Sequence, residues 1–430
     1  MLKKNLLKPI LFVLFICYFL PFSILAQGTY QAYFGNLHSH TSNSDGMNEP
    51  EDAYYYARYT AGLDFLAVTD HVEQIDFLEW YYNKDEADNA TINGTFVGIA
   101  GWEWGSPIYG HINVFNTTNI IDDIGSLWYY EDFPAFINWL LSNSPAIAQF
   151  NHPGDDVYVN NWNDFEYINT STDVVFPLIE FQNVQQATDW YEFALAKGWH
   201  LSPVWNQDNH SADWGTKNDG RAGVWAATLS RSSLFEAINA GRTYATMDKN
   251  AKIWIELNGI PMGSQQPIQS SMLLHLFLTD VDNESWTSIE LVTKNGVLMN
   301  IGTYNGNLDT TFTLNLTNDE WVFVRAIQAD SDYLWSAPVY VTGTISNLSN
   351  TIHEKSIQLF PNPAKDYFVI NTGEENSCVM IYNVMGKLVY ENSFQKSLKV
   401  NSKVLAAGSY FVNITVSNLN YTKNIIIRDF

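Results

Sequence analysis

A histidine pair at the end of an apolar run is the feature that most constrains how this chain can fold. The run Phe34 to Leu37 leads directly into His38-Ser39-His40, and Asp45 follows a few residues later. Side chains two positions apart on a strand point to the same face, so both imidazoles can reach one metal ion. Such a pair can also be just a polar strand end. The rest of the chain favours the metal-binding alternative.

Further potential ligands follow other strand-like runs downstream. Asp70 and His71 follow the run 63–69, and Glu103 follows the run 96–102. His152 comes after the run 146–150, and Asp208 and His210 come after the run 201–205. His111 is expected in a turn that Gly110 opens. Seven of the nine histidines lie between residues 38 and 210, and six of those seven follow such a run. Histidines scattered through a core would not show this arrangement.

Strand-like and helix-like segments alternate from residue 28 to about residue 248. The predicted helices cover residues 50–60, 131–142, 186–197 and 232–240. Pro50 suits a first helical turn, and Gly62 suits the end of the same helix. This alternation predicts an α/β fold with a mainly parallel sheet, closed or open. In closed α/β barrels, functional residues gather at the carboxyl ends of the strands, where nearly all of these candidates lie.

The residue types indicate the chemistry. Imidazole together with carboxylate is a ligand set for zinc, manganese or iron, whereas magnesium and calcium prefer oxygen alone. The nine candidates suit two or three divalent ions that share a bridging carboxylate. They are His38, His40, Asp45, His71, Glu103, His111, His152, Asp208 and His210. Adjacent divalent ions can lower the pKa of a water to about 7, so the predicted reaction is a hydrolysis.

The same motifs resemble those of the PHP (polymerase and histidinol phosphatase) superfamily of metallohydrolases, and the domain would cover residues 27–248. The resemblance implies a distorted (β/α)7 barrel. It implies a first ion on His38, His40, Glu103 and Asp208, a second on Glu103, His111 and His152, and a third on Asp45, His71 and His210. Catalytic roles would fall to Glu103, Asp208 and His210, with a metal-activated water as the nucleophile. Asp70 would orient its neighbours.

Three segments look most like the secreted branch of that superfamily related to carbaryl hydrolase: 34–41, 62–71 and 241–246. A phosphoesterase acting on small or oligomeric esters is the interpretation that we prefer. Carbamate, amide or carboxylic ester hydrolysis on the same centre is an alternative, as is a catalytically silent binding protein. Arg221, Arg231 and Arg242 could clamp a phosphate, but structural ion pairs are commoner for arginine.

Several other residues invite a functional interpretation. Trp102 and Trp104 flank Glu103 and share the opposite face, so at least one should be core. Pocket lining is the alternative for these two and for Trp128, Tyr129 and Tyr130. We expect His200, His275 and His353 to be structural.

Residues 1–26 combine a basic start with an apolar stretch and match a secretory signal peptide. No later run approaches the roughly 18 apolar residues of a spanning helix, so no transmembrane segment is expected. Cys378 would be the one cysteine left after removal of the signal, which excludes an intrachain disulfide. The formal net charge of −24 disfavours stable nucleic-acid binding.

The chain changes character after residue 248. Short alternating runs predict a β-sandwich accessory domain over 249–343, without a cluster of ligands. A polar linker follows at 344–356. Residues 357–430 resemble the type A sorting domain of the type IX secretion system, although a plain β-sandwich binding module is the alternative. The resemblance implies the type IX machinery as a partner, and release or attachment at the cell surface.

Overall fold

The computed structural model describes residues 29–121, 132–154, 159–269, 271–316, 321–343, 357–373, 377–383, 387–416 and 419–428. The predicted signal peptide, the predicted linker and the residues Trp128, Tyr129, Tyr130 and His353 lie outside this part of the chain. The chain divides into two compact units, Met1–Ile345 and Ser346–Phe430. Within the described residues, no helix is long and apolar enough to cross a membrane.

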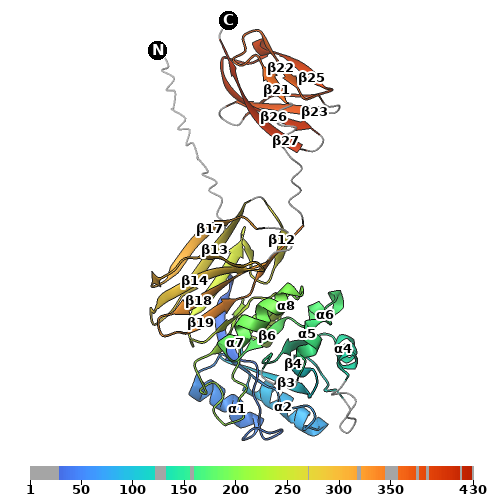
Figure 1. The fold of residues 1–430 in the computed structure, drawn as a ribbon, viewed down its shortest axis with the longest axis vertical. Helices are drawn as coiled ribbons and strands as arrows, with labels where there is room; N and C mark the ends of the chain where they lie inside the picture. The colour runs from blue at the N-terminus through green and yellow to red at the C-terminus, as the bar shows by residue number, and fades with distance from the viewer. Residues whose placement is uncertain are drawn as a thin grey trace, which may run out of the picture. The chain divides into compact units, whose positions relative to one another are not determined.

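Strands and helices alternate in the first part of the first unit, in agreement with the sequence pattern (Figure 1). The strands are β1 (Gln31–Asn36), β2 (Phe65–Val68), β3 (Val97–Ser106), β4 (Gly110–Phe115), β5 (Ile147–Phe150), β6 (Leu178–Phe181), β7 (Ser202–Trp205), β8 (Arg221–Ala226) and β9 (Thr243–Thr246). The helices are α1 (Pro50–Tyr56), α2 (Phe77–Ala90), α4 (Phe133–Ser142), α5 (Asn161–Phe165), α6 (Thr170–Val175), α7 (Val184–Gln186), α8 (Glu192–Ala196) and α9 (Arg231–Asn239), with π-helical turns η2 (Ala57–Ala61) and η3 (Ala187–Tyr191).

The first predicted helix shows how the local sequence sets these elements. Pro50 begins α1, where its missing N–H costs nothing, and η2 extends the same helix. Gly62 ends it with a φ of 68°, a left-handed conformation that glycine adopts without strain. The next helix, α2, was not predicted. Asp76 and Glu79 form a capping box at its start, a signal that the sequence did contain.

The sheet is mixed, not mainly parallel. β1, β2 and β3 pair in parallel, as do β5, β6 and β7. Between these two sets, β4 pairs antiparallel with both β3 and β5, and β8 pairs antiparallel with β1. Residues 107–109 are too few for a parallel crossover, so β3 and β4 form a hairpin. His111 therefore lies in β4 and not in a turn, as the sequence had suggested.

The strand order runs β8-β1-β2-β3-β4-β5-β6-β7. Among the described residues, β6 is the one strand that forms a ladder with β7. On its other side β7 lies beside β9, where the Thr243 hydroxyl donates to the Pro203 carbonyl at 3.0 Å. The coarse prediction of a strand-rich α/β fold is therefore correct. The closed seven-stranded barrel stays a prediction.

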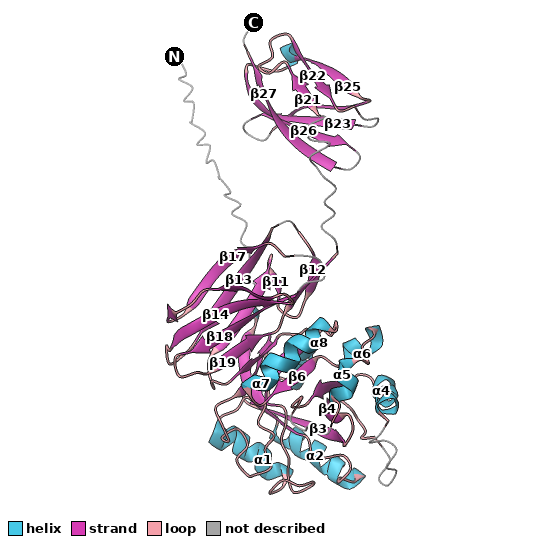
Figure 2. Ribbon diagram, viewed as in Figure 1, coloured by secondary structure: helices cyan, strands magenta, loops and turns pink. Residues whose placement is uncertain are grey.

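The described residues of the rest of the first unit form strands and their connecting loops, as Figure 2 shows. They are β10 (Lys252–Leu257), β11 (Ile260–Pro261), β12 (Gln265–Pro267), β13 (Met272–Thr279), β14 (Ser285–Thr293), β15 (Gly296–Asn300), β16 (Tyr304–Asn305), β17 (Leu308–Leu314), β18 (Trp321–Gln328), β19 (Tyr333–Ser336) and β20 (Val339–Thr342). The sheet β11-β10-β13-β17 faces β14 and β18 across one apolar core, to which Trp254, Leu276 and Trp286 contribute.

These strands join the α/β part through a continuous sheet. β19 pairs antiparallel with β9, and Trp335 lies opposite Ala245 in that ladder. The Trp335 ring also stacks near Trp205 of β7, at a centroid distance of 6.2 Å. The contacts place both parts in one compact unit, so the division at residue 248 stays an interpretation of the sequence.

The second unit has two antiparallel sheets around its own core. One sheet has the order β21-β22-β25 and the other β24-β23-β26-β27. The strands are β21 (Gln358–Phe360), β22 (Tyr367–Asn371), β23 (Ser377–Asn383), β24 (Leu388–Phe394), β25 (Ser397–Asn401), β26 (Gly408–Val416) and β27 (Leu419–Ile427). A short 3-10 turn, η4 (Ser402–Val404), follows β25. Phe368, Ile381 and Val412 are fully buried in this core.

Candidate metal centre

The ends of neighbouring strands bring histidines and carboxylates into one cluster. By position, His38 and His40 follow β1, His71 follows β2, Glu103 lies in β3, His111 in β4, His152 follows β5, Glu180 lies in β6, and Asp208 and His210 follow β7. Isolated parallel bridges between Ser39 and Asn209 and between His71 and Glu103 extend the pairing into the cluster. Residues far apart in the sequence meet because their strands are neighbours in the sheet.

The carboxylate of Glu103 lies at the middle of this cluster and is 1% exposed. Its Oε1 is 3.3 Å from His38 Nε2, 3.1 Å from His111 Nδ1 and 3.7 Å from His152 Nε2, and its Oε2 is 3.3 Å from His40 Nε2 and 3.2 Å from His71 Nδ1. Asn151 donates to Oε1 from its side-chain amide at 2.7 Å and fixes the carboxylate. One carboxylate between two groups of imidazoles is the geometry of a bridging ligand.

Glu180 was not among the predicted site residues, yet it contacts the cluster directly. Its Oε1 lies 2.9 Å from His38 Nδ1, and its Oε2 accepts from the backbone N–H of His152 at 2.9 Å. Because Glu180 engages Nδ1 of His38, the opposite nitrogen faces Glu103 and Asp208. The available signal was an acidic residue inside the otherwise apolar strand Leu178–Phe181.

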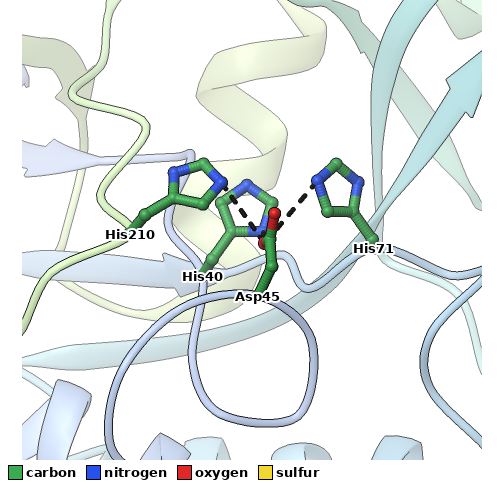
Figure 3. A group of neighbouring side chains, drawn as sticks. All are labelled: His40, Asp45, His71 and His210. Carbon is green, nitrogen blue, oxygen red and sulfur yellow. Dashed lines mark ion pairs between the residues drawn. The ribbon is translucent and has the colours of Figure 1, made fainter.

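Asp45 lies at the exposed end of the cluster, with His40, His71 and His210 around it (Figure 3). Its Oδ1 is 3.3 Å from His210 Nε2 and 3.8 Å from both His71 Nε2 and His40 Nδ1. The side chains of Asp45 and His210 are 45% and 41% exposed, whereas His38 and His40 are fully buried. The cluster therefore runs from a buried end at Glu180 to a solvent-facing end at Asp45.

Asp70 shapes the loop that carries Asp45. Its carboxylate accepts from the Thr41 N–H at 2.7 Å, from the Thr41 hydroxyl at 2.6 Å and from the Ser44 hydroxyl at 2.6 Å. Gly46 closes the loop onto Thr41 O, and a Cβ at Gly46 would lie 2.5 Å from the His40 carbonyl carbon. Asp70 thus acts on the loop, and only through it on the imidazoles.

The groups of ligand atoms that lie within 4.8 Å of one another overlap the predicted sets. Besides the group around Asp45, they are His38, His40 and Glu103; His71, Glu103 and His111; and His38, His152 and Glu180. Asp208 Oδ1 joins the first of these at 3.3 Å from His38 Nε2 and 3.1 Å from His40 Nε2. All nine predicted ligands therefore lie in the cluster, and their role as ligands stays a prediction.

Two of the predicted ligands have a left-handed backbone. φ is 30° at His152 and 47° at Asp208. Such angles cost on the order of 1–3 kcal/mol for a residue with a Cβ and persist where the surroundings fix them. This strain directs both side chains into the cluster and supports a functional role.

The carboxylates dominate the pKa values at the buried end. Burial lowers the pKa of His40, but Asp208 and Glu103 outweigh it and raise this pKa to about 9. Burial also opposes protonation of His38, whose pKa nevertheless lies well above its usual value because of the surrounding carboxylates. Burial raises the pKa of Glu103, but His38 and other imidazoles hold it well below its usual range.

Burial dominates the pKa values of His71 and Glu73. It lowers the pKa of His71 to about 4, since the attraction of Glu103 is smaller than the loss of solvation. It raises the pKa of Glu73 to about 7. Glu73 Oε1 lies 3.5 Å from His71 Nδ1, so Glu73 is a further acidic residue at the edge of the cluster that the sequence analysis missed.

The donor set fits divalent cations. His38 Nε2 and His40 Nε2 lie 3.1 Å apart, a separation at which two unprotonated nitrogens repel unless a proton or cation lies between or beside them. Within the described part of the chain, Asp208 Oδ1 is buried without a hydrogen-bond partner. Buried polar atoms are normally satisfied. Imidazole nitrogens and carboxylate oxygens at these distances suit zinc, manganese or iron.

The other candidates have structural roles. Trp102 and Trp104 are both fully buried in the core, as predicted for at least one of them. Arg231 pairs with Asp88 at 2.6 Å, and Arg242 with Glu236. Arg221 donates to the carbonyls of Asn218 and Gly220 instead of to a carboxylate, and the expected structural pairs of His200 and His275 are present with Asp173 and Asp309.

Residues 358–428 match the family of secretion system C-terminal sorting domains. The chain carries a type IX sorting domain. The protein is therefore exported by type IX secretion to the cell surface or the outside, and the secretion machinery is one of its partners.

Other similarities are partial. A curated relative, an endo-acting ulvan lyase of Formosa agariphila, is 29% identical over 115 residues, which cover 26% of this chain and 22% of the lyase. A solved two-domain protein of Bacteroides vulgatus, described as containing a predicted PHP-like metal-dependent phosphoesterase, aligns with 73% of this chain and 96% of its own. That alignment has 16% identity and a TM-score of 0.43. Fibronectin(III)-like modules of Clostridium thermocellum CbhA cover 41% of this chain and 94% of theirs, at 9% identity and a TM-score of 0.19.

Proposed function

We propose that the chain is an exported metal-dependent hydrolase, with phosphoesters as the preferred substrates. The observation that carries the proposal is the position of Glu103 between two groups of imidazoles, with five nitrogen contacts of 3.1–3.7 Å. A buried carboxylate shared in this way suits adjacent cations better than a single one. Bound divalent ions would supply Lewis acidity and a water of lowered pKa.

The chain's own residues would prepare this chemistry. His38, His40 and Asp208 would hold one ion with Glu103, and Glu180 would fix the ring of His38 through its Nδ1. His71, His111 and His152 surround the other side of Glu103. At His38 the Glu180 carboxylate orients an imidazole whose other nitrogen then faces the cluster. The catalytic assignment of Glu103, Asp208 and His210 belongs to the same proposal.

The exposed end of the cluster would receive the substrate. Asp45, His210 and His111 are 45%, 41% and 35% exposed, while the buried end is closed. Asp45, Glu103, Asp208 and Glu180 together carry four negative charges, so three divalent ions would leave the centre with a net positive charge. The loaded centre would therefore attract an anionic ester, which favours phosphoesters over neutral carbamates, amides or carboxylic esters.

A substrate panel with metal analysis tests this proposal. The purified full chain would be analysed for zinc, manganese and iron, then assayed with chromogenic phosphate monoesters and diesters, carboxylic esters and carbamates. We expect bound metal and turnover of at least one phosphoester, which the His40→Ala variant loses. Hydrolysis of carbamates or carboxylic esters alone would move the proposal to those substrates.

A matched control separates loss of the centre from general damage. His200 pairs with Asp173 at 2.7 Å outside the cluster, and its side chain is 40% exposed. The His200→Gln variant should keep full activity. Metal binding without turnover of any ester, with His40→Ala identical to the parent, would instead favour a binding protein on this scaffold.

A further inference from the structure

A second group of possible ligands lies outside the histidine-rich centre. Carboxylate oxygens of Asp248, Asp280 and Asp282 lie within 4.8 Å of one another. Asp248 follows β9, whereas Asp280 and Asp282 follow β13, so the group forms only when these two loops meet. The sequence analysis expected no cluster of ligands over residues 249–343, the range in which Asp280 and Asp282 lie.

We propose that Asp248, Asp280 and Asp282, named here the acidic cluster, form a calcium site that braces the first unit. Calcium binds oxygen ligands at roughly 2.3–2.6 Å, so two oxygens on the same ion can be at most about 5 Å apart. The separation of 4.8 Å or less meets this limit without any rearrangement. An acidic cluster alone would not justify a site, and a second observation points to a cation.

That observation is the amide of Gln328, which ends β18 and is 1% exposed. Its Nε2 lies 3.4 Å from Asp280 Oδ2, so the amide group faces the acidic cluster. Its Oε1 is buried and has no hydrogen-bond partner among the described residues. Leaving such an oxygen unsatisfied costs about 1–3 kcal/mol. Amide oxygens are regular calcium ligands. The amide presents its Nε2 to Asp280, and a half-turn about the Cγ–Cδ bond of Gln328 would bring Oε1 to a cation held by Asp280 and satisfy it.

The acidic cluster has no close cationic partner, although Arg221 attracts Asp248 from a longer distance. Across the described ranges, none of its three carboxylates forms an ion pair with lysine or arginine. The three carboxylates, with oxygens within 4.8 Å of one another, repel each other when ionised. A divalent cation would remove this repulsion.

Backbone contacts already organise the two loops around these carboxylates. Asp248 Oδ1 accepts from the N–H groups of Asn250 and Ala251 at 2.6 Å. Asp280 accepts from the N–H groups of Asp282 at 3.0 Å and Glu284 at 2.8 Å. The carboxylates are therefore held in place before any ion binds, and calcium would pay little ordering entropy.

The donor chemistry favours calcium over the ions of the histidine-rich centre. The acidic cluster and Gln328 offer oxygen alone, with no imidazole among the grouped ligands. Hard cations prefer such a set, and calcium accepts irregular geometry more readily than magnesium does. Export to the cell surface or the outside suits calcium modules of extracellular affinity, with Kd about 10⁻⁴ to 10⁻³ M.

Calcium titration of the full chain tests the proposal. The titration uses the His40→Ala variant, because this substitution weakens metal binding at the histidine-rich centre. The heat of calcium binding and the rise in Tm then report on the acidic cluster. We expect saturable binding and a higher Tm with calcium than with magnesium at equal ionic strength. No saturable binding, or an equal response to both ions, would overturn the proposal.

Two variants locate the site. Asp282 is exposed, so Asp282→Asn should fold and weaken calcium binding at least about 10-fold through loss of one charged ligand. Gln328→Met removes the unsatisfied amide and should also weaken calcium binding, without lowering stability in the absence of calcium. The exposed Asp85 of α2 supplies the control Asp85→Asn, which should bind calcium like its parent. Parent-like affinity in Asp282→Asn and Gln328→Met would exclude a site here.

Discussion

The histidine-rich centre and the acidic cluster lie in one compact unit and yet differ in donor chemistry. The first combines imidazoles with shared carboxylates at the ends of sheet strands, while the second contains only carboxylates from two loops. Imidazole selects zinc, manganese or iron, and oxygen alone selects calcium. The comparison teaches that donor type, more than the number of neighbouring charges, decides which cation a cluster can use.

The largest expected effect is a loss of hydrolysis that leaves calcium binding unchanged. His40→Ala removes a nitrogen 3.1 Å from Asp208 and 3.3 Å from Glu103. We expect kcat/KM for the best phosphoester to fall more than about 100-fold, beyond the usual cost of losing an outer partner. Calcium binding by the same variant should not change. Loss of both responses would mean that the two sites are not independent.

The next largest effect should come from removing the metal ions of each site separately. Phenanthroline, which prefers transition metals, should abolish hydrolysis, and added zinc or manganese should restore it. Because the expected calcium affinity is low, dialysis against calcium-free buffer should lower Tm through loss of calcium and leave hydrolysis intact. By linkage, a ligand present at 100 to 1,000 times its Kd stabilises the folded state by about 3–4 kcal/mol. This is the largest change in the free energy of unfolding that we expect from removing either ion. Full activity after phenanthroline treatment and dialysis would contradict a metal-dependent reaction.

Glu180→Gln tests how the histidine-rich centre is oriented. The carboxylate engages His38 Nδ1 at 2.9 Å, and such partners usually contribute about 10–100-fold to metal affinity. We expect this loss in a zinc titration, with kcat less affected once the metal is saturating. Glu236→Gln, which breaks a surface pair with Arg242, is the matched control. Unchanged zinc affinity in Glu180→Gln would remove Glu180 from the centre.

The smallest expected effect is a pH dependence that only the metal-free centre should show. The folded-state pKa of His40 is about 9, above the unfolded value of about 6.5. Stability from this group is therefore complete below about pH 6.5 and is lost as the pH rises to about 9. We expect a decrease on the order of 1 kcal/mol in the free energy of unfolding across this window, measured by denaturant titration. Loading with zinc should flatten the curve, because the metal replaces the proton.

Much of the local structure was predictable because the signals are local. The short alternating runs expected after residue 248 are strands in the structure, as β10 and β13 show. Pro50 and Gly62 marked the two ends of one helix. In both cases the side-chain period or a capping residue carries the information within a few positions. The sorting domain was identified in another way, by the resemblance of residues 357–430 to a known family, which the family match over residues 358–428 confirms.

The errors concern pairing between distant segments. We did not predict that β4 runs antiparallel to β3 and β5, so His111 was expected in a turn although it lies in a strand. Glu180 was missed because a lone acid in an apolar strand has no partner visible in the sequence. The acidic cluster was missed because Asp248 and Asp280 approach only through folding.

The sequence by itself determined which ligand types the chain can offer and at which strand ends they occur, because both depend on residue identity and short-range period. Only the tertiary structure decided that Glu103 lies between two groups of imidazoles, that Glu180 holds His38, and that Gln328 faces Asp280. Those contacts depend on the order of strands in the sheet and on loop closure over long separations. Such choices are made by packing of the whole unit, and no local pattern encodes them.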